Sequence, residues 1–291
     1  MINYKIYLEN DQKDPKTIEA YIKAVVEFQK WYSSSTGQDF IPEIITSLDI
    51  KDYISWLATN KKQAARTINK KLGGLKNYFN YLIEEGILKV NPTVKIKSKK
   101  ISSLQQSPRW LTRHEQARLL HCIAKVKNSK KMARDYCMAQ LMLQAGLRVF
   151  EVAALDIDDI DLRRNILTIR EGKGNKMAVL PINKDLRKAI ESYLDVRETK
   201  KSALFISKRN NRLTDRGIQH QFRKYFDLIN LPDTTVHSLR HSFCKNLLDQ
   251  RVELTVVAQL ARHENLDTTR RYVTPGEHDL RSAVEKTNWE D

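Results

Sequence analysis

The first hundred residues show the apolar spacing of amphipathic helices. Between Thr17 and Tyr32 the apolar positions recur close to every 3.6 residues, which predicts a helix with one buried stripe. Asp49 is placed as the N-cap of a second helix, because its carboxylate can accept hydrogen bonds from the free N–H groups of a first turn. A third helix is predicted from about Ala64 to Glu85, stopped by Gly86. The pattern therefore predicts a small N-terminal helical bundle.

The helical pattern lapses between Asn91 and Arg109. This stretch carries two prolines, four serines and a run of closely spaced lysines. Such a composition is typical of a positively charged linker that can run over a duplex. We therefore predict a helical domain at 1–95, a basic linker at 96–109 and a second domain at 110–291.

The second half mixes helical and strand patterns. Thr112 and Glu115 form the spacing of a capping box, and a helix through Ala133–Ala145 is expected to end near Gly146. The segments NILTIR and MAVLPI read as two short strands joined by the glycine-containing hairpin EGKGNK, and DLRKAIESYLDVR reads as an amphipathic helix. Further helical patterns start at Thr214, Ser238, Val252 and Asp267. The predicted fold class is mainly α with a small β-sheet.

The charge balance favours a polyanionic partner. The chain of 291 residues has a formal net charge of +16 and a pI near 9.6. The excess is spread over the chain, with 17 basic and 11 acidic side chains in residues 1–100 and 34 and 24 in the remainder. Such a distribution suits a protein that grips nucleic acid with two domains, although a merely soluble basic protein would share it.

Several other classes are disfavoured by the sequence. No run of about eighteen apolar residues occurs, and the polar N-terminus lacks the apolar stretch of a signal peptide. The three cysteines are odd in number and show no close pairing, which fits a reducing interior. We therefore expect a cytoplasmic protein with no membrane partner.

Five short segments hold polar residues that composition alone would not place together. They are GLRVFEVAAL, GKGNK, HSLRH, ARH and RRY, with His237 and Arg240 three residues apart, Arg240 and His263 23 apart, and His263 and Tyr272 nine apart. The order Arg–Lys–His-x-x-Arg–His–Tyr resembles the catalytic set of tyrosine recombinases and phage-type integrases. The resemblance covers nearly the whole chain, because TIEAYIKAVVEF and ARTINKKLGGLKNYFNYLIEEGILKVNP are similar to the family's helical, SAM-like core-binding domain. One motif would be weak, but the ordered set is specific.

The resemblance implies phosphoryl transfer at a DNA backbone. Arg148 and Arg240 would hold the non-bridging phosphate oxygens, and Tyr272 would attack phosphorus to form a covalent 3′-phosphotyrosine. A phenol is a poor nucleophile with an ordinary pKa near 10, so a proton acceptor is needed. The remaining roles implied are His237 as proton acceptor, His263 as phosphate hydrogen-bond partner, Lys173 as proton donor to the leaving oxygen, and Glu151 as a supporting residue.

Some assignments stay open at the level of sequence. Lys176 shares the hairpin of Lys173 and could take its role, and His241 reads as structural or DNA-facing. His237 and His241 have a metal-like i, i+4 spacing, but no third ligand accompanies them, so no metal and no other cofactor is expected. Arg262 stands where the family commonly has glycine; we expect it to adopt helical geometry and to add a phosphate contact. The DNA-binding candidates are Asn69, Lys70, Lys71, Lys76, Lys97, Lys99, Lys100 and Arg262.

The family resemblance also bears on partners and role. It implies a recombination site in double-stranded DNA, a homotetramer on DNA whose protomers can be monomeric in free solution, a Holliday junction, and accessory DNA-binding proteins as an option. The tail after Tyr272 is predicted to dock on a neighbouring protomer, with folding back in cis as the alternative. The favoured role is resolution of transposon cointegrates or replicon dimers. The alternatives are an integrase or excisionase of a mobile element, a type IB-like topoisomerase, and a DNA-binding protein that has lost catalysis.

Overall fold

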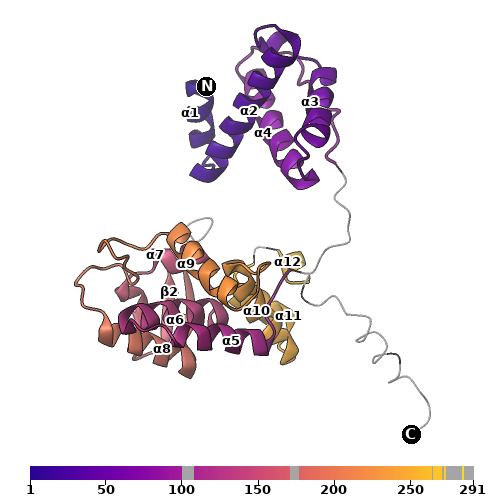
Figure 1. Ribbon diagram of the computed structural model, residues 1–291. Helices are drawn as coiled ribbons and strands as arrows, with labels where there is room; N and C mark the ends of the chain where they lie inside the picture. Colours follow the sequence, from indigo (N-terminus) through magenta and orange to yellow (C-terminus); the bar gives the residue numbers. More distant parts are fainter. Residues whose placement is uncertain (100–107, 171–176, 264, 271, 273–283, 285–291) are drawn as a thin grey trace. The chain divides into compact units, whose positions relative to one another are not determined.

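The chain forms two compact units. The computed structural model describes residues 1–99, 108–170, 177–263, 265–270, 272 and 284 (Figure 1). The units span Met1–Leu104 and Gln105–Asp291, so the division falls within the stretch predicted as a linker. Residues up to Lys99 belong with the first unit, because Ile96 is 5% exposed in its core and Asn69 binds the Lys99 backbone. The first unit thus extends past the predicted boundary at residue 95.

The first unit is a helical bundle. Its helices in the described residues are α1 (Ile2–Asn10), α2 (Pro15–Thr36), α3 (Ser47–Thr59) and α4 (Ala65–Glu84), with a 3₁₀ turn at Pro42–Ile44. The helix α4 packs against the other three helices, and large aromatic side chains fill the space between them. The helix α1 was not predicted; it inserts Tyr4 and Leu8 into the core, where Tyr4 donates to Asn77 Oδ1 at 2.7 Å.

The second unit contains a small antiparallel sheet in the order β1–β2–β3. The predicted strands are found as β2 (Ile166–Ile169) and β3 (Ala178–Pro181), and the unpredicted β1 (Ile160–Asp161) pairs with β2. The hairpin residues 171–176, with Lys173 and Lys176, lie outside the described residues. Lys100 and the tail from residue 273, apart from Val284, lie outside them as well.

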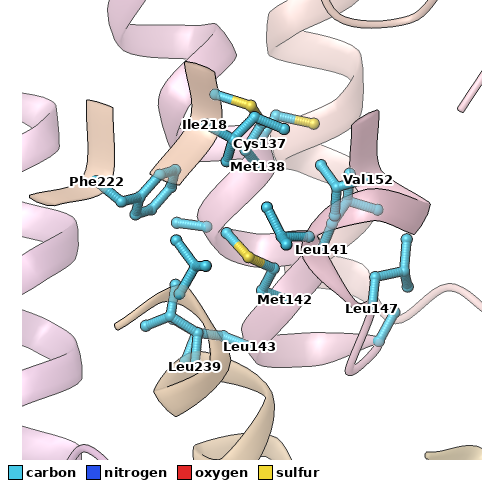
Figure 2. Packing of buried hydrophobic residues seen from close by; sticks show 14 of the residues in the cluster. Cys137, Met138, Leu141, Met142, Leu143, Leu147, Val152, Ile218, Phe222 and Leu239 are labelled. Carbon is cyan, nitrogen blue, oxygen red and sulfur yellow. The ribbon is translucent and has the colours of Figure 1, made fainter. Parts of the chain in front are cut away.

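Helices surround a core built on α6 (Ser129–Gln144). Side chains of α6 such as Met138, Leu141 and Met142 meet Phe222 and Leu239 from two later helices (Figure 2). The other helices of the described part are α5 (Arg113–Ala124), α7 (Val149–Ala154), α8 (Lys184–Val196), α9 (Asp215–Leu228), α10 (Val236–Asp249), α11 (Leu254–Leu260) and α12 (Leu266–Arg270). The predicted mainly-α fold with a small sheet is confirmed. The free cysteines Cys137 and Cys244 are fully buried in apolar clusters, as expected for core residues.

Two predicted helix starts are wrong for the same physical reason. The predicted capping box of Thr112 and Glu115 does begin α5. However, α3 is capped by Thr46 and α10 by Thr235, three residues before Asp49 and Ser238 respectively. In both cases the residue at which the helix was predicted to begin sits at the third helical position and accepts from the N–H of the true N-cap. Short polar side chains serve either position, so residue type alone does not distinguish them.

Candidate active site

A left-handed glycine sets the direction in which α7 begins. After α6 ends, Gly146 has a φ of +60°, and Arg148 becomes the N-cap residue of α7. Glu151 lies in the first turn of α7 and accepts from the Arg148 backbone N–H at 2.6 Å. Its other oxygen, Oε1, accepts from the Arg148 guanidinium at 2.9 Å. The sequence GLRVFE thus folds so that Glu151, which is only 2% exposed, binds both the backbone N–H and the guanidinium of Arg148.

Arg240 projects from α10 into the buried centre of the unit and is 5% exposed. One guanidinium nitrogen donates to the carbonyl oxygen of Gly146, and the other donates to that of Ala261. Arg240 therefore ties together the turn before α7 and the end of α11. These two bonds fix its orientation, because each is made to backbone and not to a movable side chain.

The segment after α11 carries Arg262 and His263. Arg262 has a φ of +54°, so the expectation of helical geometry is wrong. The reason is local: the chain must reverse at the end of α11, and this turn requires the left-handed region. The Arg262 guanidinium binds Glu151 Oε2 at 2.7 Å, and the Arg262 carbonyl accepts from Arg148 at 3.0 Å. This arginine therefore lies within the cluster formed by Arg148 and Arg240.

Tyr272 lies beside the two histidines of the same region. The Tyr272 side chain is 3% exposed, and its ring stacks on that of His263 with a centroid distance of 6.4 Å. His263 is itself oriented by a 2.7 Å hydrogen bond between Nδ1 and Thr269 Oγ1, on α12. The Tyr272 hydroxyl lies 2.5 Å from His241 Nδ1, one helical turn beyond His237 on α10. His237 is exposed.

The contact between His241 and Tyr272 is the feature that sequence reasoning missed. The spacing of His237 and His241 was considered only as a metal pattern. The i, i+4 spacing places both histidines on one face of α10, and this was the available signal that His241 shares the site. Among the described residues, no group of three or more His, Cys, Asp or Glu side chains could hold a metal ion.

The site carries an excess of positive charge. The guanidiniums of Arg148 and Arg262 bind the Glu151 carboxylate, and the Arg240 guanidinium shares the Gly146 carbonyl with Arg262. Burial alone would raise the Glu151 pKa, but Arg262, the hydrogen bond from the Arg148 backbone and the Arg148 charge together lower it, so the carboxylate stays ionised. Burial and the neighbouring arginines lower the Arg240 pKa to about 10, which still leaves it charged near neutral pH. The cluster is therefore suited to hold an anion.

The same charges keep two histidines neutral. Burial, followed by Arg240 and Arg148, lowers the His263 pKa to about 4. Partial desolvation and the same two arginines lower the His237 pKa as well. Neutral imidazoles can accept a proton, whereas imidazolium ions cannot. The arrangement thus supplies a charged anion cradle, neutral histidines and a tyrosine hydroxyl in one place.

The DNA-binding candidates of the first unit differ in how their side chains are used. Asn69 makes two hydrogen bonds to the backbone of Lys99, at 2.9 and 2.8 Å. Lys71 forms a 2.6 Å ion pair with Glu27 and is 16% exposed. The candidates Lys70 and Lys97 are exposed, and Lys76 and Lys99 are half-buried.

The described helices include none that is long and apolar enough to cross a membrane.

Comparisons with known proteins agree with the fold and the motifs. The model of the phage integrase family matches residues 109–278, and that of the phage integrase N-terminal SAM-like domain matches residues 3–87. A relative named TnP I resolvase from Bacillus thuringiensis is 28% identical, with 97% of each chain covered. Tyrosine recombinase XerA of Pyrococcus horikoshii is 31% identical over 97% of this chain and 91% of its own.

Solved structures share the fold. The Tn1549 transposon integrase in complex with a circular intermediate DNA gives a TM-score of 0.75 at 17% identity and covers 98% of both chains. XerH site-specific recombinase bound to a palindromic difH substrate also gives 0.75, at 21% identity, with 92% of this chain and 79% of that chain covered. The resemblance read from the motifs is thus confirmed: the chain belongs to the phage integrase family of tyrosine recombinases.

Proposed function

We propose that this recombinase cuts and rejoins DNA at a specific site through a covalent bond to Tyr272. The observation that carries the proposal is that three arginines donate to backbone carbonyls of two adjacent turns, residue 146 before α7 and residues 261 and 262 after α11. The next residue, His263, stacks on Tyr272. Such an arrangement combines a nucleophile with fixed positive charge, the two requirements of a phosphoryl transfer in which charge accumulates on phosphate oxygens.

In the proposed reaction the Tyr272 oxygen attacks the phosphorus of the scissile phosphodiester. The P–O5′ bond breaks, which leaves a 3′-phosphotyrosine and a 5′-hydroxyl. Arg148 and Arg240 stabilise the negative charge on the non-bridging oxygens. Because Thr269 engages His263 at Nδ1, Nε2 is the ring nitrogen of His263 available to a phosphate oxygen. Lys173, outside the described residues, is proposed to protonate the departing 5′-oxygen. Rejoining is the reverse attack by a 5′-hydroxyl.

The phenolic proton must reach an acceptor before or during the attack. The family resemblance assigns it to His237, which has a lowered pKa and is exposed at the cluster. The hydrogen bond at 2.5 Å connects the hydroxyl to His241. We propose that His241 holds Tyr272 before DNA enters, and that His237 accepts the proton once the phosphate is bound. Both histidines lie on α10, one helical turn apart, so the hydroxyl would pass from one to the other by a change of the Tyr272 χ1 angle, because ring rotation leaves the hydroxyl on its axis.

We further propose that the second unit is catalytic and that the first also grips the DNA. Support comes from the basic excess in both halves and from the DNA complexes of the structural neighbours. By analogy with the relatives named resolvase and Xer recombinase, the favoured role is resolution of transposon cointegrates or replicon dimers. Four protomers would exchange strands through a Holliday junction, with the tail after Tyr272 docked on a neighbour.

The test separates a recombinase from a topoisomerase and from a DNA-binding protein without catalysis. DNA fragments that become covalently attached to the protein are first sequenced to find the site. Two copies are then placed as direct repeats on a supercoiled plasmid. We expect deletion of the intervening segment, a covalent protein–DNA adduct when rejoining is blocked, and a four-way junction when the second pair of strand cleavages is blocked. Relaxation of plasmids regardless of the site, without deletion, would instead show a topoisomerase, and DNA binding with no adduct would show a protein without cleavage activity.

A further inference from the structure

The turn after α11 holds an arginine in a conformation that favours glycine. The N–H of Arg262 donates to Gln259 O and that of His263 to Ala258 O, both at 3.0 Å. This pair of bonds defines a Schellman motif, in which the residue after the C-cap must adopt positive φ. Here the C-cap is Ala261 and the left-handed residue is Arg262, with a φ of +54°. An L side chain is strained in this region, so something must compensate.

The compensation is visible in the contacts of the Arg262 side chain. Its guanidinium donates to Glu151 Oε2 at 2.7 Å, to Leu260 O at 3.0 Å and to Gly146 O at 3.3 Å. The Arg262 side chain is 14% exposed and that of Glu151 is 1% exposed, so the ion pair is shielded from water. A shielded pair of this kind holds its geometry more strongly than one on the surface.

A direct contact with DNA does not fit these contacts. Nη2 of Arg262 already binds two protein acceptors, Glu151 Oε2 and the Gly146 carbonyl, and its Nε is buried. In the described residues, Nη1 and Nη2 of Arg148 bind one acceptor each. A phosphate held side by side by two nitrogens of Arg262 would have to displace Glu151 or the Gly146 carbonyl from Nη2, and the Glu151 side chain is only 1% exposed. The Arg148 side chain, by contrast, is 29% exposed and is the more open of the two arginines. The phosphate contact predicted for Arg262 is therefore better assigned to its neighbour.

Glu151 is shared between two guanidiniums, one on each oxygen, and Oε2 also accepts from the Arg148 backbone N–H. Oε1 binds Arg148 and Oε2 binds Arg262, while the Arg262 carbonyl accepts the second guanidinium nitrogen of Arg148. Without the Arg262 side chain, the Arg148 guanidinium would be the remaining guanidinium partner of the buried Glu151 carboxylate. The two Glu151 oxygens could then pair with both terminal nitrogens of Arg148. A guanidinium paired through two nitrogens with a carboxylate is less available to a phosphate, because the two anions compete for the same donors.

We propose that Arg262 is a positioning residue that occupies one oxygen of Glu151 so that Arg148 is presented to the scissile phosphate. This inference rests on the proposed function, in which Arg148 binds that phosphate. It also explains why a strained arginine stands at a position that glycine would occupy without strain. The side chain does a task that glycine cannot perform.

The chain offers a matched control at the end of α10. Arg251 has a φ of +60° in the same motif, with the N–H groups of Arg251 and Val252 bonded to Leu248 O and Leu247 O. Its side chain is exposed. Arg251→Gly therefore relieves the same backbone strain without touching the site. Arg262→Gly relieves the strain and removes the guanidinium, and Arg262→Lys keeps the charge but loses the three-acceptor geometry.

The experiment measures three quantities on full-length variants: DNA affinity, the rate of covalent adduct formation on saturating DNA, and the titration of His263 by NMR. Arg251→Gly should match the wild type in all three. Arg262→Gly should bind DNA normally but form adducts on the order of 100-fold more slowly, the scale expected from a misplaced catalytic group. Because a positive charge near His263 is removed, the His263 titration should move to higher pH. Arg262→Lys should restore that titration without restoring the rate.

The outcomes separate this inference from the proposed function. If the wild type forms no adduct, the proposed function fails. If the wild type forms adducts and Arg262→Gly forms them equally fast, the positioning role is overturned. Weaker DNA binding by Arg262→Gly with an unchanged rate on bound DNA would make Arg262 a DNA contact instead. Full recovery of the rate in Arg262→Lys would show that charge alone suffices and would also overturn the proposal.

Discussion

Gly146→Ala should lower the free energy of unfolding of the second unit by more than Gly86→Ala lowers that of the first, because an added Cβ meets other atoms only at Gly146 of these two left-handed glycines. Gly146 has a φ of +60°, and a Cβ atom at this position would lie 2.7 Å from Phe243 Cε1 and 3.1 Å from Cγ. Phe243 is 6% exposed in the apolar cluster that also contains Tyr272. The ring cannot move into solvent, so the backbone turn or the cluster must shift.

The magnitude follows from two additive causes. Placing alanine in the left-handed region costs about 1 kcal/mol. Forcing an extra carbon against a buried ring costs a further 1–3 kcal/mol, roughly, as for other overpacked cores. The unfolding free energy of the second unit should therefore fall by about 2–4 kcal/mol. Gly86 provides the control, because it has a φ of +72° with no atom within 4 Å of an added Cβ. Gly86→Ala should cost only about 1 kcal/mol, in the first unit.

The change should also reach the active site. The Gly146 carbonyl accepts from Arg240 and from Arg262, so a displaced turn moves two guanidiniums. Urea unfolding monitored by hydrogen exchange and mass spectrometry assigns each loss of protection to a segment. Adduct formation is measured in parallel at a urea concentration where all variants are folded. A loss at Gly146 no larger than at Gly86, with an unchanged cleavage rate, would refute the reasoning.

Further predictions concern pH, a buried carboxylate and the end of the first unit. Because the folded pKa of His263 is about 4, below the unfolded value near 6.5, the unfolded chain binds more protons between these values. Stability should therefore fall as pH drops, by at most about 2 kcal/mol from pH 7 to 5 in urea unfolding, and His263→Gln should flatten this dependence. Tyr225 donates to Asp135 Oδ2 at 2.6 Å, and Asp135 is fully buried. Tyr225→Phe should therefore lower the free energy of unfolding by about 1–3 kcal/mol without slowing cleavage. A loss below about 0.5 kcal/mol would contradict this. Asn69→Ala removes the hydrogen bond from the Lys99 amide, worth about 1 kcal/mol, so hydrogen exchange at that amide should speed up about fivefold. Weaker DNA binding with unchanged exchange would instead make Asn69 a DNA contact.

Helices with regular apolar spacing could be predicted from the sequence because their burial follows directly from that spacing. The helix α4, expected at Ala64–Glu85 and found at Ala65–Glu84, is an example. The helix α1 could not be predicted in this way, because the exposed Ile2 and Ile6 are apolar like the buried Tyr4 and Leu8, so the apolar positions do not mark a single face. Its position depends on contacts with α4, where the Tyr4 ring meets Tyr78 and Tyr81. Contacts between distant residues of this kind leave no local period.

In the active site, too, some features follow from the sequence pattern and others depend on contacts between distant residues. The order and spacing of the motifs led to Arg148, Arg240 and Tyr272, which the structure brings into one region. The pairing of His241 with Tyr272 spans 31 residues and depends on the path of the chain after α11. The left-handed backbone of Arg262 depends on where α11 ends, and the preference for glycine there is only statistical. Sequence patterns indicated the candidate reactive residues, whereas the partners that hold them came from the fold.

The central claim is that Tyr272 becomes covalently joined to DNA. Purified protein is mixed with sheared DNA from its source, the reaction is stopped with detergent, and the DNA that stays attached is sequenced, with Tyr272→Phe as the matched control. The Phe variant keeps the ring in its apolar cluster and lacks only the hydroxyl, so it should bind DNA as the wild type does. We predict adducts at one or a few sites with the wild type and none with Tyr272→Phe. Adducts of equal yield with Tyr272→Phe, or salt-sensitive DNA binding by the wild type without any adduct, would contradict the account.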